Sequence, residues 1–182
     1  MYLLPNTKKQ YKANLHTHST YSDGILTPEE LKEKYKGEGY AILAITDHEL
    51  CLDHSDLNDD DFLTLTSYEI ATNTPNSDRF TKKTYHMNLI SKDPKNTKQV
   101  FFHPDQLGRR KDLYEEVECD GYKEREYSVE CMNAVIKEAN ENGYLVSYNH
   151  PTWSMQNWTD YSGLKGLWGV GGHQRRLRTD GS

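Results

Sequence analysis

The sequence predicts an α/β fold in which a parallel sheet is covered by helices. Two observations carry this prediction. Strand-like and helix-like segments alternate through the first two-thirds of the chain, as they do in proteins built from βαβ units. The segment at 41–45 is apolar on both faces, which is typical of a strand buried between two layers. About five strands can be recognised, and a sixth is expected to start at Leu167.

The N-terminal part is expected to begin with a short strand at 13–15. A helix is expected to start at Thr27, because Thr27 can cap it, Pro28 suits its first turn and Glu30 can complete a capping box. Gly37 is expected to end this helix, since glycine tolerates the backbone conformation that follows a helical C-terminus.

The remainder of the chain carries three further strand candidates, at 62–68, 85–90 and 144–148. The charged stretch 91–124 has no clear period and is expected to be a loop with a short helix. Between 126 and 142 the apolar residues fall on one helical face, which predicts an amphipathic helix. These residues are Val129, Met132, Val135, Ile136 and Ala139.

Length and composition indicate one domain at residues 1–170. Three of the chain's seven arginines fall within residues 171–182, so we expect this tail to lie outside the core. The formal net charge of -6 argues against a stable nucleic-acid partner and against binding to an anionic membrane. No apolar run is long enough to cross a membrane, and residues 1–14 lack the hydrophobic core of a secretory signal, so a cytoplasmic location is expected.

Histidines and carboxylates follow several of the expected strands. His16 and His18 alternate in an extended segment, so their imidazoles lie on one side of it and can chelate one divalent ion. Asp47, His48 and Glu49 come directly after the most apolar strand, where ionisable groups need partners or a metal. Active sites of barrel-like α/β proteins lie at this end of the strands.

Four further residues extend the pattern: Asp23, Glu69, His86 and His150. The first three have a simpler alternative when each is considered singly, whereas His150 repeats the pattern of an apolar strand followed by a histidine. Asp23 suits a turn, Glu69 suits a helix cap or the surface, and a lone His86 in an apolar strand is more often hydrogen-bonded than metal-bound. Imidazole and carboxylate ligands without cysteine suit Zn, Mn or Fe. More than four such ligands imply more than one ion, with a carboxylate able to bridge them.

In their order and spacing, these motifs resemble the PHP (polymerase and histidinol phosphatase) family. The resemblance rests on these residues: His16-Thr17-His18-Ser19, Tyr21-Ser22-Asp23-Gly24, Thr27-Pro28-Glu29-Glu30-Leu31, Ile45-Thr46-Asp47-His48, Glu69, His86 and Asn149-His150-Pro151. It runs from about residue 13 to residue 170 and is most specific in the first part of the chain. It implies a distorted (β/α)7 barrel that holds divalent ions and hydrolyses phosphate esters, among them histidinol phosphate, nucleotides and short oligonucleotides.

The resemblance also implies a role for each side chain. His16, His18 and Glu69 would hold a first divalent ion. Glu69 would bridge to a second ion, which His86 and His150 would also hold.

A third ion would be held by Asp23 and His48, so the chain would carry two or three divalent ions. Asp47 would orient one of the ligands from behind, with a purely structural role as its alternative. The residues expected to act in catalysis are Asp47, His48 and Glu69.

The sequence departs from the family pattern after residues 166–170. The family continues with a Glu-containing segment and an Asp-x-His that complete the first and third metal sites, and neither is present in this sequence. We therefore expect a barrel that is incomplete at its C-terminus, with His173 a poor substitute for the missing ligands. A sheet that cannot close leaves an exposed edge at 144–148 or 167–170, and such an edge favours self-association.

The expected function is hydrolysis of a small phosphomonoester or phosphodiester by a metal-bound hydroxide. Arg79, Lys82 and Lys83 are candidate contacts to this phosphorylated substrate, with solvated surface charge as their alternative. An amidohydrolase also begins its barrel with an HxH pair, but it does not explain Asp23 or the Thr-Asp-His after the second strand. The other alternative is a truncated, weakly active or inactive relative that binds metal.

Overall fold

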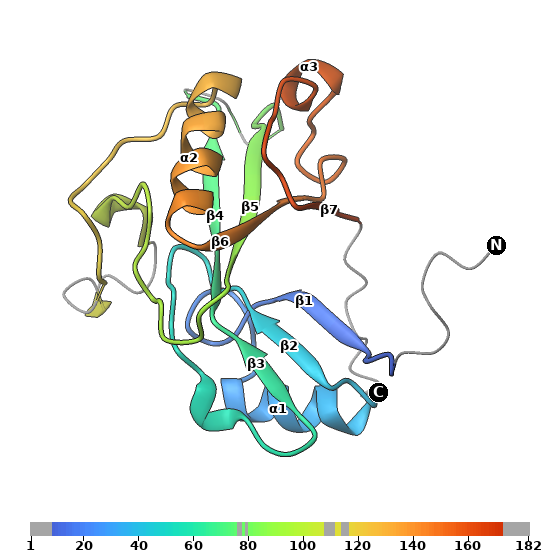
Figure 1. Cartoon of the computed structure of the whole chain (residues 1–182). Coiled ribbons are helices and arrows are strands. Elements are labelled where there is room, and N and C mark those ends of the chain that lie inside the picture. The colour runs from blue at the N-terminus through green and yellow to red at the C-terminus, as the bar shows by residue number, and fades with distance from the viewer. Residues whose placement is uncertain (1–8, 76–77, 79, 108–111, 114–116, 173–182) are drawn as a thin grey trace.

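A computed structural model gives the structure of residues 9–75, 78, 80–107, 112–113 and 117–172. Within these residues seven strands form two sheets, which lie one above the other in Figure 1. A helix of ten residues accompanies one sheet and a helix of 13 residues the other, which confirms the expected α/β class.

The first sheet is parallel throughout and has the order β1 (Ala13–Thr17), β2 (Ile42–Ile45) and β3 (Leu63–Leu65). Helix α1 (Pro28–Gly37) connects β1 to β2, as in a βαβ unit. The N-terminus of α1 carries the capping box that the sequence predicts, and the helix ends at the predicted glycine.

The second sheet has the order β4 (Ser67–Asn73), β5 (Thr84–Ser91), β6 (Tyr144–Asn149) and β7 (Gly169–Gly171). Here the expectation of a parallel sheet is wrong, because β4, β5 and β6 pair antiparallel and only β7 runs parallel to its neighbour β6. The connection from β4 to β5 is short, and its described residues form no helix. A parallel crossover needs about a dozen residues or more and usually a helix, so this short connection returns the chain antiparallel.

The two sheets meet through an isolated parallel bridge between His48 and Glu69 rather than through a continuous ladder. At this bridge the Glu49 N–H donates to the Glu69 carbonyl over 2.8 Å. The segment expected as one strand at 62–68 is interrupted at Thr66, so that β3 pairs with the first sheet and β4 with the second. Within the described residues the strands therefore do not close into the barrel that the resemblance implies.

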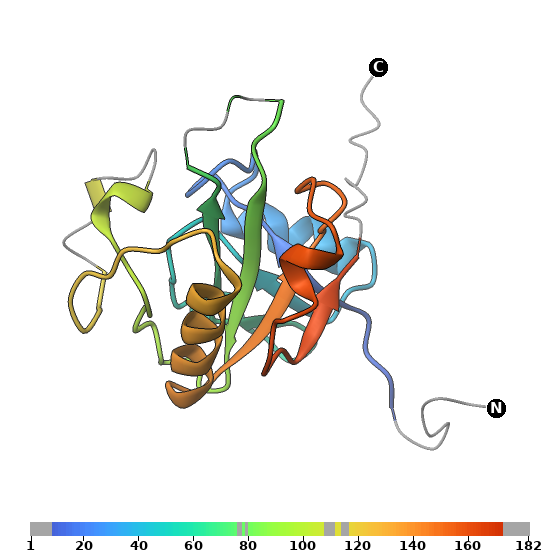
Figure 2. The same cartoon turned by 90° about the horizontal axis from the view of Figure 1, so that it is seen from above.

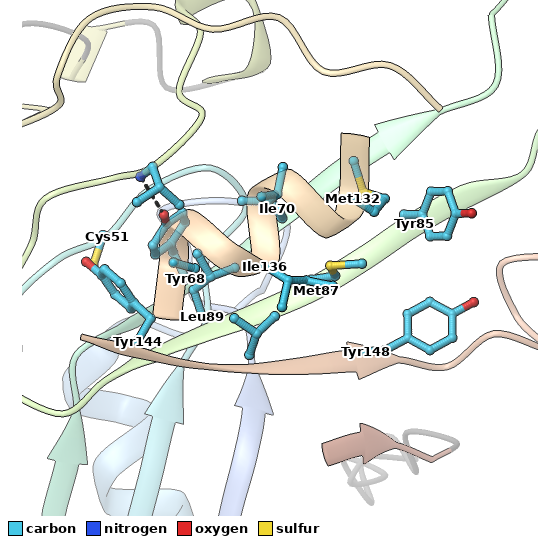
Figure 3. Packing of buried hydrophobic residues seen from close by; sticks show 14 residues of the cluster. Cys51, Tyr68, Ile70, Tyr85, Met87, Leu89, Met132, Ile136, Tyr144 and Tyr148 are labelled. Carbon is cyan, nitrogen blue, oxygen red and sulfur yellow. Dashed lines mark hydrogen bonds between the residues drawn. The ribbon is translucent and has the colours of Figure 1, made fainter. Parts of the chain in front are cut away.

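Helix α2 (Val129–Glu141) lies along one face of the four-stranded sheet (Figures 1 and 3). Its buried face is the one that the sequence predicts, and Met132 and Ile136 are fully enclosed there. They belong to the same core cluster as Met87 of β5 and Tyr144 of β6. This apolar layer fixes β5 and β6, which carry or precede two of the expected ligands.

A smaller core lies beneath the first sheet, where Leu31 and Tyr35 of α1 pack with Leu43 and Phe62. Helix α1 lies beneath the three-stranded sheet and α2 against the four-stranded one, and the view from above shows α1 behind β5 and α2 in front of it (Figures 1 and 2). The strand ends between the two cores are thus supported from both sides.

Three short helical elements complete the described chain: η1 (Ser55–Leu57), η2 (Pro104–Leu107) and α3 (Trp158–Tyr161). Element η2 agrees with the short helix expected within 91–124. None of the helices among the described residues has the length and apolar character needed to cross a bilayer.

The last described strand differs slightly from its prediction. It begins at Gly169 rather than at Leu167, and it ends at Gly171, the first residue of the expected tail. The rest of that tail from 173 onward, including His173, lies outside the described residues.

Candidate metal centre

The expected ligands lie where the two sheets meet. His16 is in β1 and His18 follows it, Glu69 is in β4, His86 is in β5, and His150 comes directly after β6. Two residues from loops join them: Asp23 and His48. All seven side chains come together at one end of the first sheet, although His86 lies early in β5 and does not follow the strand-end pattern.

The carboxylate of Glu69 is the centre of this cluster. Its Oε1 lies 3.1 Å from His16 Nε2 and 3.7 Å from His150 Nε2. Its Oε2 lies 3.3 Å from His48 Nδ1 and 3.5 Å from His18 Nε2. Because the Glu69 side chain is only 1% exposed, these imidazoles replace most of the water that a carboxylate normally binds.

Three overlapping groups have ligand atoms within 4.8 Å of one another: His16, His18 and Glu69; His18, Asp23 and His48; and His48, Glu69 and His86. The first group is the set that the resemblance assigns to the first ion. The second adds His18 to the expected pair at the third site.

His150 stands slightly apart from these groups but still belongs to the cluster. Its ring centroid lies 5.3 Å from that of His16 and 5.0 Å from that of His86. The expected pairing of His86 with His150 beside Glu69 is therefore compatible with the geometry, although the group within 4.8 Å that contains His86 has His48 in place of His150.

The electrostatics of the cluster favour a charged Glu69 carboxylate beside neutral His18 and His86. Burial by itself would raise the pKa of Glu69, but hydrogen bonds with His150 and His16 hold it well below its ordinary value. Burial lowers the pKa of His18 to about 4 and that of His86 to about 4, against the opposing charge of Glu69. These two imidazoles are therefore neutral near pH 7, which is the form that binds metal.

This donor set fits a divalent cation. No Lys or Arg side chain in the described part of the chain lies within ion-pair distance of Glu69, so its buried negative charge faces imidazoles and the Asn149 amide. A buried carboxylate without a cationic partner is costly, and a cation would remove that cost. Nitrogen and carboxylate ligands without thiolates suit Zn, Mn or Fe.

Asp47 lies behind the cluster and supports it through a loop. Its Oδ1 accepts hydrogen bonds from the Ser19 N–H at 2.8 Å and from the Ser22 hydroxyl at 2.6 Å. Its Oδ2 accepts from the Ser19 hydroxyl at 2.6 Å. Ser22 Oγ also lies 3.5 Å from His18 Nδ1, so Asp47 reaches this histidine through a serine. The placement fits the expected orienting role, and Asp47 is only 1% exposed.

The same loop carries Asp23, which is 62% exposed at its side chain. Its Oδ1 lies 3.7 Å from His18 Nδ1 and 3.8 Å from His48 Nε2, so the expected approach of Asp23 to His48 is observed. Gly24 makes this loop possible, because a Cβ there would lie only 2.2 Å from the His18 carbonyl oxygen.

Sequence reasoning missed a buried ion pair directly beside His48. Glu49 has a left-handed backbone (φ 59°), and its Oε2 accepts a 2.7 Å hydrogen bond from Arg125 Nη2. Its Oε1 accepts from the Ala71 N–H at 2.8 Å, and its carbonyl accepts from Gln99 Nε2 at 2.9 Å. These bonds hold the residue after His48 in a conformation that is otherwise unfavourable. No local pattern marks Arg125 or Gln99.

The side chain of Asn149 was also missed, although its neighbour His150 was singled out. Its Nδ2 donates to Glu69 Oε1 at 2.7 Å and to Asn88 Oδ1 at 2.8 Å. Asn88 Nδ2 in turn donates to the Leu15 carbonyl at 2.9 Å. This buried chain of amides connects β6, β5 and β1 and holds one oxygen of Glu69 in place.

A cleft of about 1130 Å³ opens onto the histidine cluster, with the exposed indoles of Trp153 and Trp168 among its walls. A second cavity of about 570 Å³ shares His48, His86 and Trp153 with it and also contains Lys82. Both cavities give a small molecule access to the cluster.

The three candidate phosphate contacts differ in where the structure places them. Lys82 lies in the second cavity, beside the histidine cluster. Lys83 Nζ pairs with Asp160 Oδ2 at 2.8 Å, so it is engaged in a structural contact. Arg79 lies outside the described residues.

A buried carboxylate surrounded by imidazoles lies at the mouth of a large cleft, an arrangement suited to binding a divalent cation within reach of a small molecule. A family model for the PHP domain matches residues 14–144, and the chain belongs to this family. No curated protein sequence matches the chain.

Several solved structures share the fold. A predicted metal-dependent phosphoesterase from Bifidobacterium adolescentis is 16% identical, with a TM-score of 0.55 over 89% of this chain and 77% of that one. An amidohydrolase from Chromobacterium violaceum, solved with bound sulfate and no metal, is 14% identical, with a TM-score of 0.54 over 87% of this chain and 76% of that one.

A third neighbour is a two-domain protein from Bacteroides vulgatus that contains a predicted PHP-like metal-dependent phosphoesterase. It is 18% identical, with a TM-score of 0.50 over 88% of this chain and 43% of that one. At these identities the comparison concerns the fold alone.

Proposed function

We propose that this chain is a metal-dependent phosphoesterase whose site holds two or three divalent ions. The observation that carries the proposal is the Glu69 carboxylate, buried among imidazoles without a cationic side chain beside it in the described residues. Its family membership supports the same class of chemistry.

Glu69 would be shared between two ions. His16 and His18 would complete the first site, since their ligand atoms lie within 4.8 Å of one another and of the Glu69 carboxylate. His86 and His150 would contribute to the second, from two strands that pair antiparallel.

Asp23 and His48 would hold a third ion. Both lie beside His18, and Asp23 is the most exposed member of the cluster, so this site would be the most open to solvent and the weakest. His48 contacts Glu69 with one nitrogen and Asp23 with the other, so it would tie the third site to the shared carboxylate.

Bound divalent ions supply Lewis acidity, which polarises phosphoryl oxygens and acidifies an attacking water. The residues of the chain prepare the site for them. Neutral His18 and His86 keep a lone pair available for a cation near pH 7, and the Asn149 amide fixes one Glu69 oxygen. Lys82 would contact an oxygen of a small phosphorylated substrate from the second cavity.

The test compares wild-type protein with the isosteric variant Glu69→Gln. Both are stripped with chelator, reloaded with Zn²⁺, Mn²⁺ or Fe²⁺ and assayed with a small phosphomonoester and a dinucleotide. The wild type is expected to regain turnover with at least one metal, whereas Glu69→Gln should lose metal and turnover together. Turnover that survives in chelator, or that Glu69→Gln retains, would overturn the proposal.

The same assay separates the alternatives when an amide substrate is added to it. Hydrolysis of an amide substrate, with no phosphoester turnover, would assign an amidohydrolase reaction instead; a structural neighbour carries that name. Full metal loading without turnover of any substrate would indicate a relative that binds metal but is inactive.

A further inference from the structure

Ser154 places one buried hydroxyl between two of the proposed metal ligands. Its Oγ lies 3.2 Å from His86 Nδ1 and 3.4 Å from His150 Nδ1, and the residue is 3% exposed. The same ring nitrogen of both histidines therefore faces this hydroxyl. No sequence motif marks Ser154, which belongs to the turn that follows β6.

The backbone fixes the position of this hydroxyl on two sides. The Ser154 N–H donates to the His150 carbonyl at 3.1 Å, and the Ser154 carbonyl accepts from the Thr84 N–H at 3.4 Å, at the start of β5. His150 itself has a φ of 29°, which is unfavourable for a residue with a Cβ. Such a conformation persists only where its surroundings impose it, and here it brings the ring of His150 and the hydroxyl of Ser154 together.

The chemistry of a hydroxyl suits this arrangement. A serine oxygen has two lone pairs, so it can accept an N–H from each of two rings. A neutral imidazole carries one proton, and a proton on Nδ1 leaves the lone pair on Nε2. His150 Nε2 is the nitrogen that points to the shared carboxylate, 3.7 Å from Glu69 Oε1.

We propose that Ser154 is a positioning residue that holds His86 and His150 as Nδ1–H tautomers and thereby presents Nε2 of both rings to a cation. The inference rests on the proposed metal centre, but it does not depend on which reaction that centre performs. Hydrogen bonds of this kind to the second nitrogen of a metal-binding histidine orient the ring and raise the ligand's basicity.

The first test is a spectrum of the metal-free protein. Long-range ¹H–¹⁵N correlation of histidine-labelled protein distinguishes a protonated ring nitrogen from a bare one, and His86→Gln and His150→Gln variants assign the signals. Both rings are expected to carry the proton on Nδ1. A wild-type spectrum with the proton on Nε2 of either ring would overturn the proposal, whether or not any Ser154 variant folds.

The second test measures Zn²⁺ affinity by calorimetry. Ser154→Ala should weaken binding on the order of tenfold or more, as is typical when such a partner is removed, while Ser154→Thr, which keeps the hydroxyl, should bind more tightly than Ser154→Ala. Ser91→Ala is the matched control, because it removes another buried hydroxyl, bonded to the Asp93 carbonyl at 2.8 Å, at the far end of β5 from Thr84.

If Ser154→Ala bound Zn²⁺ with wild-type affinity, or if Ser91→Ala lost as much affinity as Ser154→Ala, Ser154 would be a purely structural residue and the proposal would be wrong. If the protein hydrolysed no phosphoester but showed both rings as Nδ1–H tautomers and the expected affinities, the proposed function would be contradicted. This inference would still stand.

Discussion

His48 and Glu69 join the two sheets both by backbone and by side chain. Their backbones form the isolated parallel bridge between the sheets, and His48 Nδ1 lies 3.3 Å from Glu69 Oε2. The proposed metal centre therefore lies where the two sheets meet rather than on a single strand or helix. A cation bound there would tie the sheets together, so metal loading should raise the melting temperature of the protein.

Replacing His48 by alanine is expected to remove about one ion per chain without abolishing metal binding. His48 contacts Asp23 at 3.8 Å through Nε2, whereas His16 and His18 keep their own contacts with Glu69. Elemental analysis of the dialysed variant measures the change. His103→Ala is the matched control, because that imidazole pairs with Glu124 away from the cluster. Unchanged metal content in His48→Ala would leave His48 as a structural residue.

Replacing Gly24 by alanine should deform the loop that carries Asp23. The added Cβ would meet the His18 carbonyl oxygen at 2.2 Å, so the backbone must move, and overpacking of this kind costs about 1–3 kcal/mol. Urea unfolding and Zn²⁺ titration of the variant should show lower stability and weaker binding.

Gly37→Ala provides the control, since a Cβ there meets nothing within 4 Å at the end of α1. It should change the free energy of unfolding by no more than about 0.5 kcal/mol. If Gly24→Ala behaved in the same way, the packing of this loop against His18 would be refuted.

Local features of this fold could be predicted from the sequence. The capping box of α1 involves residues three positions apart, and the buried face of α2 repeats at helical spacing, so both are visible in a short window. The direction of β5 and β6 could not be predicted, because the expectation of parallel strands assumed helical crossovers. The described part of the connection from β4 to β5 contains no helix, and β5 and β6 pair antiparallel although α2 lies between them in the chain.

The candidate site shows the same division. His16, His18 and His48 stand in recognisable motifs, so their convergence on Glu69 could be anticipated. Ser154 could not, because it meets His86 from 68 positions away and belongs to no motif. Arg125 contacts Glu49, which is 76 positions away in the sequence, and it directly follows the stretch 91–124 that has no clear period. Supporting contacts between residues so far apart in the sequence depend on the whole fold.

Cys51 should be unreactive in the native protein. Burial raises the pKa of its thiol to about 12, so almost no thiolate exists at pH 8. In a Cys119→Ser/Cys131→Ser variant, a thiol reagent should label Cys51 only when urea unfolds the chain. Labelling of the folded variant at the unfolded rate would contradict the burial of Cys51.

The same shift predicts how stability changes in alkali. The pKa of Cys51 is raised above its ordinary value of 9.0, so its contribution is complete below pH 9 and is lost as the pH rises towards 12, because the unfolded chain gives up the proton first. Over this interval the free energy of unfolding should fall more steeply in the wild type than in Cys51→Ala, by about 1.4 kcal/mol per pH unit. Parallel curves for the two proteins would show that the thiol does not titrate as expected.

Strand β7 is expected to mediate self-association. Among the described residues it pairs only with β6, and Val170 on it is 68% exposed. An uncovered apolar edge recruits further strands, and a lysine at such an edge opposes this. Light scattering should therefore detect oligomers of the wild type that Val170→Lys reduces. A wild type that stays monomeric at high concentration would show that this edge does not mediate self-association.

The central claim is that Glu69 and the histidines around it form a divalent-metal centre. Anomalous X-ray diffraction from crystals grown with Zn²⁺ or Mn²⁺ tests it most directly. We predict at least two anomalous peaks, both about 2 Å from a Glu69 oxygen and each within the same distance of at least one histidine nitrogen of the cluster. Crystals saturated with metal that show no peak within bonding distance of Glu69 would contradict the account.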